Sequence, residues 1–172
     1  MSDSLKSRWR LGSMSERMLK WWAERLARFQ EESHRVMARE SLQLGLDKTR
    51  HPSRPKYRYV DVVVHLSERP PLKWTFHYLV RDGVPYPLGR GERRESPSVV
   101  IELPYYVVYY LLKGRDRQGR PFDIRTAYGY GLINYQTANP YEPLEGGILI
   151  VEDIFKRHRE RMFRRVFGDL EG

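Results

Sequence analysis

The chain has 172 residues, and its 31 Lys and Arg side chains against 22 Asp and Glu give a formal net charge of +9 at neutral pH. Hydrophobic residues make up 40% of the sequence and aromatic residues 13%, which is enough for the core of one domain and excludes disorder along the whole chain. There is no cysteine, so disulfide scaffolds, zinc ribbons, iron–sulfur clusters and cysteine nucleophiles are excluded.

Composition also bears on location, habitat and partners. No stretch approaches the ~18–20 uncharged apolar residues of a membrane span, and the first ten residues lack the apolar run of a signal peptide. We therefore expect a cytoplasmic protein with no membrane partner. Arginine outnumbers lysine 24 to 7, and the sequence has only two Asn, four Gln and no Cys. This depletion of thermolabile side chains is expected of a thermophile, whereas a GC-rich genome would favour arginine without any heat. The positive charge attracts polyanions, and composition alone does not choose among them.

The pattern of residues 15–44 predicts one long amphipathic helix, with Ser15 as its N-cap and Gly45 as its stop. Trp21 points about 100° away from Trp22, so we expect Trp22 in the core and Trp21 against a partner subunit or a neighbouring loop. The predicted core stripe recurs at three- and four-residue steps and consists of Met18, Trp22, Leu26, Phe29, Ser33 and Val36.

Residues 57–66 and 72–80 alternate between apolar and polar side chains, which predicts two β-strands joined in a hairpin. One face of the hairpin is then apolar and the other polar. A loop centred on residue 69 places two polar pairs opposite each other across the strands: His65 with Lys73, and Asp61 with His77.

A second hairpin is expected further along the chain. Residues 98–112 are rich in β-branched and aromatic side chains, which predicts a strand with a bend or an edge at Pro104. The turn at 114–120 leads into an alternating strand at 121–128. Between the two hairpins, residues 81–97 contain several glycine and proline breaks and predict a long exposed loop with three cations: Arg90, Arg93 and Arg94.

The predicted fold class is α+β, with an antiparallel sheet of about four strands, in two hairpins, flanked by a long N-terminal helix and a C-terminal helix. The C-terminal helix occupies residues 149–170, and the irregular residues 129–147 are expected to cover one edge of the sheet. In terms of organisation, residues 1–46 hold the N-terminal helix, residues 47–56 form a basic linker, and residues 57–172 hold the sheet and the C-terminal basic helix of the same domain.

The C-terminal helix carries six cations against a single carboxylate between positions 156 and 165, enough to neutralise several phosphates. The alternative is a solvated helix face whose cations favour the helix C-terminus. We expect RNA or another single strand to contact six arginines of this helix and the exposed loop: Arg157, Arg161, Arg164, Arg90, Arg93 and Arg94. Five tyrosines are placed either to stack on unpaired bases or to pack within the sheet: Tyr105, Tyr106, Tyr109, Tyr110 and Tyr128.

The sequence shows no pattern for a metal or a cofactor, and we expect neither. The five histidines lack ligand spacing, and no P-loop or dinucleotide-binding fingerprint is present. A serine nucleophile elbow of the GxSxG type is also missing.

The polar face of the predicted sheet gathers the residue types that metal-free RNA cleavage uses. An imidazole or a carboxylate can deprotonate the 2′-hydroxyl, and Arg or Lys can stabilise the charge of the phosphorane. The alternative is that the outer face of a half-solvated antiparallel sheet is polar by default. The candidates from the two hairpins are Asp61, His65, Lys73, Thr75, His77, Tyr109 and Arg125.

The segment Arg125-Thr126-Ala127-Tyr128 follows a Tyr- and Val-rich strand and a turn. It resembles the terminal strand of the barnase/EndoU/colicin/RelE-type ribonuclease toxin superfamily of phages and mobile elements, and the similar element order spans residues 57–135. The resemblance implies metal-independent RNA cleavage in which Arg125, Thr126 and Tyr128 contact phosphate. It also implies an earlier histidine as the acid or base, for which His51 and His65 are equal candidates.

The sequence therefore predicts a basic protein that binds nucleic acid, with metal-independent endoribonuclease activity as the sharper hypothesis. The alternative is a non-enzymatic structural or assembly protein, of a viral type, that forms homo-oligomers through its helices. The two differ in what they require of the polar sheet face. Catalysis needs a concave site with convergent His and Arg side chains, whereas assembly does not.

Overall fold

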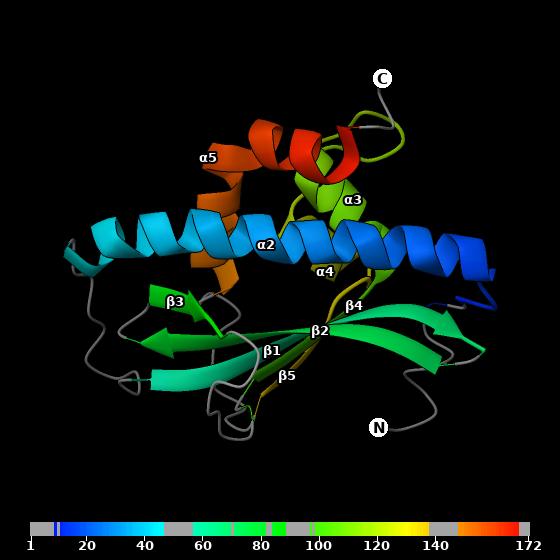
Figure 1. Cartoon of the computed structure of the whole chain (residues 1–172), viewed down its shortest axis with the longest axis horizontal. Coiled ribbons are helices and arrows are strands. Elements are labelled where there is room, and N and C mark those ends of the chain that lie inside the picture. Colours follow the sequence, from blue (N-terminus) through cyan, green and yellow to red (C-terminus); the bar gives the residue numbers. More distant parts are fainter. Residues whose placement is uncertain are drawn as a thin grey trace.

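A layer of helices covers one face of a five-stranded sheet (Figure 1). The structure is a computed structural model, and it describes residues 9, 11–46, 57–69, 71–81, 84–88, 97, 99–137 and 148–168. The predicted α+β class and the two long helices are confirmed: α2 (Glu16–Leu46) crosses the sheet, and α5 (Ile148–Phe167) lies on the same side of it. In the order in which they lie, the strands are β3 (Val84–Pro87), β2 (Pro71–Arg81), β1 (Tyr57–Glu68), β4 (Val99–Pro104) and β5 (Asn134–Thr137).

The first predicted hairpin is confirmed, including its register. β1 and β2 pair antiparallel with Asp61 opposite His77 and His65 opposite Lys73, and the register shifts at a bulge just beyond His65. Because both strands alternate apolar and polar side chains, the pairing gathers the apolar set on one face. That face forms the core beneath α2.

The sheet is mixed rather than antiparallel, which corrects the prediction of a second hairpin. β4 lies parallel to β1, and β5 pairs antiparallel with β4 at one edge, so part of the segment predicted to be irregular is a regular edge strand. β3 pairs antiparallel with β2 at the other edge, within the segment predicted as a long loop. A parallel partner is reached through a distant part of the chain, and local alternation carries no signal for it.

The strand predicted for residues 98–112 is half strand and half helix. The chain leaves β4 at Pro104, the N-cap of α3 (Tyr105–Lys113), and α3 ends at Gly114, whose φ of 76° is left-handed. The Tyr- and Val-rich run has the composition of a strand. Its buried residues fall on one side of a helix, and they are Val107, Val108 and Leu112.

The strand predicted for residues 121–128 is also a helix. The carboxylate of Asp123 accepts a hydrogen bond of 2.8 Å from the backbone N–H of Thr126 and caps α4 (Ile124–Gly129). This bond holds the pKa of the Asp123 carboxyl below its usual range. The turn predicted at 114–120 is confirmed, since an isolated antiparallel bridge closes it.

The stripe of α2 forms the centre of the core. Ser15 caps the helix as predicted, because its Oγ accepts a hydrogen bond of 3.2 Å from the N–H of Met18, but the helix continues through Gly45. Met18 is 46% exposed, so the buried stripe begins one turn later than predicted. Its buried members are Trp22, Leu26, Ser33 and Val36.

Polar contacts fix how α2 lies on β2. Nε1 of Trp74 donates a hydrogen bond of 3.2 Å to Oε1 of Gln30, and Ser33 hydrogen-bonds with Tyr78. Burial raises the pKa of the Tyr78 hydroxyl. Ser33 is therefore the polar member that the apolar stripe tolerates, since its hydroxyl finds partners inside the core.

α5 packs against α2 and α3 through fully buried side chains, of which Phe167 is the largest. The rings of Trp21, Trp22 and Tyr109 all lie within 6.3 Å of the Phe167 ring, centroid to centroid. Trp21 thus contacts another part of its own chain. Within the described helices, none combines the length and apolarity that a membrane crossing needs.

We expect Trp22→Ala to lower the free energy of unfolding by about 3–5 kcal/mol, because its 6% exposed ring leaves a large cavity. Trp21→Ala should lower it much less, since that ring is only half-buried. Urea denaturation at low protein concentration measures both values. Equal losses for the two variants would contradict the assignment of the buried face.

Candidate functional site

A cationic groove of about 700 Å³ lies between α5 and the C-terminal end of α3, and we call it the α3–α5 groove. Its lining combines five cations, one carboxylate, and a smaller apolar part. The cations are Lys113, Lys156, Arg157, Arg159 and Arg164, the carboxylate is Glu160, and the rest is Leu112, Phe163 and Gly168.

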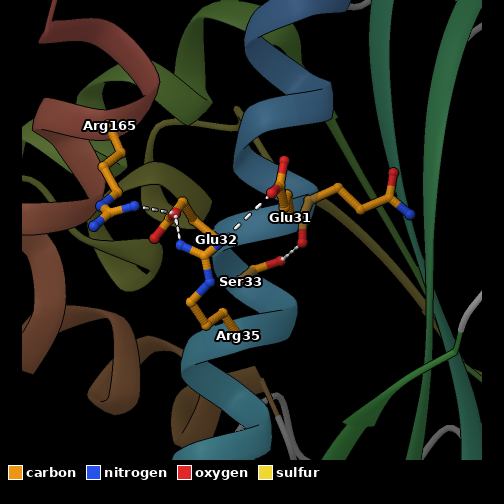
Figure 2. A network of polar contacts seen from close by, with 6 residues as sticks. Glu31, Glu32, Ser33, Arg35 and Arg165 are labelled. Carbon is orange, nitrogen blue, oxygen red and sulfur yellow. Dashed lines mark hydrogen bonds and ion pairs between the residues drawn. The ribbon is translucent and has the colours of Figure 1, made fainter.

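Arg165 of α5 does not line the groove and instead belongs to an ion-pair cluster at the contact between α2 and α5. Oε1 of Glu32 accepts hydrogen bonds from Nη1 of Arg35 at 2.6 Å and from Nη1 of Arg165 at 3.3 Å (Figure 2). Glu32 is only 5% exposed, whereas the side chains of Arg35 and Arg165 are 40% and 48% exposed, so solvent screens these pairs in part. The guanidinium of Arg165 therefore points at Glu32 on α2, although the side chain remains 48% exposed.

The end of α3 supplies the other wall of the groove. Nζ of Lys113 lies 5.5 Å above the ring of Tyr109 and donates a hydrogen bond of 3.4 Å to its hydroxyl. Gly114 leaves room for Arg159, because a Cβ at this left-handed position would overlap the guanidinium. The absent side chain thus lets Arg159 approach the C-terminal end of α3, where the helix dipole favours a cation.

Two of the six arginines predicted to contact nucleic acid line the groove, Arg157 and Arg164. Arg161 is exposed on α5 outside the lining, and the three loop residues Arg90, Arg93 and Arg94 lie outside the described residues. The prediction missed Lys113. In the sequence Lys113 is only a lysine at the end of an apolar run, and it joins the groove because α3 packs beside α5.

The tyrosines of α3 pack within the fold, which confirms the packing alternative but on a helix instead of a strand. The Tyr105 ring lies 4.8 Å from that of Trp22, and the Tyr109 ring lies 5.1 Å from that of Phe167. Tyr128 differs from them because it is half exposed on α4. The partly buried set is Tyr105, Tyr106, Tyr109 and Tyr110.

The face of the sheet opposite the helices carries two histidine–carboxylate pairs. Nδ1 of His77 lies 2.6 Å from Oδ1 of Asp61, and Nε2 of His65 lies 3.1 Å from Oε1 of Glu102 on β4. Lys73 is the cross-strand partner of His65, and Thr75 lies between the two pairs on β2. The predicted gathering of His65, Lys73, His77 and Asp61 on one polar face is confirmed.

Glu102 is the residue of this face that sequence reasoning missed. It is 4% exposed, and its Oε2 accepts a hydrogen bond of 3.0 Å from Nδ2 of Asn134. The hydrogen bond from His65 holds the pKa of the Glu102 carboxyl below its usual range, although burial works in the opposite direction. Trp9 lies on the same histidine, with ring centroids 5.4 Å apart.

The structure does not assemble the full predicted catalytic set. His77 lies on β2 opposite residue 61 of β1, which is four positions before His65. This separation is about 13 Å along the strands, so the two histidines cannot act on one phosphodiester. Arg125, Thr126 and Tyr128 lie on α4 and share no strand with the polar face, which corrects the predicted convergence.

Two further predicted features also change. The motif that carries the ribonuclease resemblance is helical, so the resemblance has no matching strand in the fold. His51 lies outside the described residues. In the part of the chain that the structure describes, no three His, Asp or Glu side chains are close enough together to hold a metal ion.

No model of a known protein family matches the chain, and no curated protein matches it. Among solved structures, the sterol carrier protein domain 2 of Helicoverpa armigera is similar over 87% of this chain and 96% of that chain, with a TM-score of 0.46 and 14% identity. A likeness this weak carries no argument about function.

We expect Glu102→Gln to lower the free energy of unfolding at neutral pH by about 1.5–3 kcal/mol, the range for hydrogen bonds to a charged group. Folding lowers the pKa of Glu102, so its stabilisation is present above the ordinary carboxylate range and is lost as the pH falls through the lowered value. The difference between variant and wild type should therefore shrink in acid. Urea denaturation at a series of pH values measures it.

The matched control is Glu160→Gln, because the Glu160 side chain is 95% exposed and belongs to the groove. We expect this variant to unfold like the wild type at every pH. A difference for Glu102→Gln that does not change with pH would contradict the role given to its charge.

Proposed function

We propose that the protein binds nucleic acid through the α3–α5 groove and that phosphate is the group it recognises there. The observation that supports this proposal is the gathering of five cations against one carboxylate in a groove of about 700 Å³. Cations brought this close repel one another, and an anion entering the groove relieves the repulsion.

The extent of the groove favours a chain of phosphates over a single anion. Lys156 and Arg164 are eight residues apart on α5, which is about 12 Å along the helix axis. Phosphates of one strand follow one another at about 3.4 Å along a nucleic-acid helix, so several of them fit this length. Each phosphate that is neutralised releases counterions, and binding should weaken as salt rises.

Replacing the groove cations Lys156, Arg157 and Arg164 together by Ala should weaken the binding of labelled RNA and DNA. The slope of log affinity against log salt should become shallower by about 2, because three phosphate contacts of a single strand are lost. Fluorescence anisotropy between about 50 mM and about 200 mM salt measures both quantities. Unchanged affinity with a flat salt response would overturn the proposal.

The matched control removes the same charge from exposed positions of α2, by replacing Arg17, Lys20 and Arg28 with Ala. This variant should lose much less affinity than the groove variant. Equal losses would assign the binding to net charge instead of the groove. Glu160→Gln removes the carboxylate of the groove and should strengthen binding, since less charge then opposes the phosphates.

RNA cleavage is a second and separate proposal, which His65 and Glu102 support. Oε1 of Glu102 accepts a hydrogen bond from the Nε2–H of His65, which leaves Nδ1 as the ring nitrogen that would accept the proton of a 2′-hydroxyl. The 2′-oxygen then bonds to phosphorus, the bond from phosphorus to the 5′-oxygen breaks, and water returns a proton to the leaving oxygen. Lys73, across the strand from His65, would stabilise the phosphorane.

Incubation of the protein with mixed-sequence RNA in excess chelator should then leave 2′,3′-cyclic phosphate ends. His65→Ala should slow this cleavage by about 10²–10⁴-fold, the usual contribution of an acid or base. His77→Ala is the matched control, because it removes a histidine of the same face that lies too far away to act on the same phosphate. Cleavage that survives His65→Ala would identify a contaminant or another site.

A further inference from the structure

Phe163 gives the α3–α5 groove an aromatic surface among its cations. It lines the groove, and its ring centroid lies 5.5 Å from that of Tyr109 and 5.7 Å from that of Phe167. These two neighbours hold the ring, which is half-buried and forms part of the groove lining. Arg159 precedes Phe163 by one helical turn and Arg164 follows it directly, so cations lie on both sides of the ring along α5.

We infer that the α3–α5 groove takes a single strand of nucleic acid, one base of which stacks on Phe163 while the neighbouring phosphates meet the cations. This inference rests on the proposed function and adds the kind of nucleic acid that the groove selects. An aromatic platform inside a cationic groove is the combination that binds single strands with little sequence preference. Every base has a π-face, so the platform accepts any of the four bases.

A duplex cannot use the same platform. Its bases are covered on both faces by their neighbours, so Phe163 would contact a base face only after that base is unstacked and unpaired. A duplex can still meet the cations through one of its backbones. The groove should therefore bind both forms through charge and add a stacking contribution for the single strand alone.

Three labelled ligands of about ten nucleotides separate charge from stacking. They are a single strand, a strand of the same length whose sugars carry no bases, and the duplex of the first strand. Fluorescence anisotropy at low salt should show the single strand binding the wild-type protein at least about fivefold more tightly than the baseless strand, since stacking of one base is worth at least that factor. It should also bind more tightly than the duplex.

Variants at Phe163 then assign the preference to this ring. Phe163→Leu should lose the preference for the base-bearing strand and keep the affinity for the baseless strand. Phe163→Tyr keeps the aromatic face and should keep the preference. The preference is a ratio measured within each variant, so a partly unfolded sample does not change it, and thermal unfolding checks each fold. The variant with Ala at Lys156, Arg157 and Arg164 should weaken the binding of both strands by a similar factor.

Each result decides between the two claims. Equal binding of the base-bearing and baseless strands to the wild type, tighter binding of the duplex, or a preference that survives Phe163→Leu would overturn the inference and leave the proposed function standing. Failure of all three ligands to bind would overturn the proposed function as well. Binding to vesicles of anionic lipid, with no binding of any strand, would also overturn both.

Discussion

The contact between α5 and α2 decides which way the cations of the C-terminal helix point. Met162, Val166 and Phe167 are fully buried there, and Arg165 reaches Glu32 across the contact (Figure 2). Because consecutive residues of a helix differ by about 100°, a rotation of α5 that brought residues 161 and 165 to the positions of 162 and 166 would move guanidinium groups into the core. The apolar stripe and the ion pair of Arg165 with Glu32 together keep the other cations at the groove and the surface.

Burial of the Glu32 carboxylate carries a desolvation penalty, which its ion pairs with arginine offset. Its Oε1 meets two guanidinium groups, whereas its Oε2 is buried without a hydrogen bond from any described residue. Solvent screens the half-exposed side chains of Arg35 and Arg165, so these ion pairs add little net stability over apolar packing, whereas the carboxylate of Glu32 is buried and is destabilised when a partner is removed. The cluster thus mainly destabilises other positions of α5 on α2, because Glu32 would lose its ion pair with Arg165 in them.

The hairpin of β1 and β2 and the helix α2 were predicted correctly, because neighbouring residues in the sequence determine them. Alternation in β1 and β2 predicted the two strands, and the loop centred on residue 69 predicted the register of their pairing; the helical stripe of α2 was displaced only at exposed Met18. Two assignments failed: residues 121–128 were assigned to a strand from alternation, and residues 98–112 from β-branched and aromatic content. β-Branched and aromatic side chains also pack well in a short buried helix, so this content does not distinguish a strand from a helix. The residues that precede the two helices indicate them better, since Pro104 is the N-cap of α3 and Asp123 is the N-cap of α4.

The site on the sheet shows what a single sequence can and cannot reveal. Glu102 stands alone in the apolar run of β4, and a buried carboxylate needs a partner, so the sequence did contain a signal for an ion pair there. The identity of that partner depends on the parallel pairing of β4 with β1, which no local pattern encodes. The same pairing places His65 and Glu102 on the face away from the helices (Figure 1), whereas the groove is lined by residues of α3 and α5. The proposed binding at the groove and the proposed proton transfer at the sheet would therefore use separate surfaces, and one strand of nucleic acid would have to pass around the edge of the sheet to reach both.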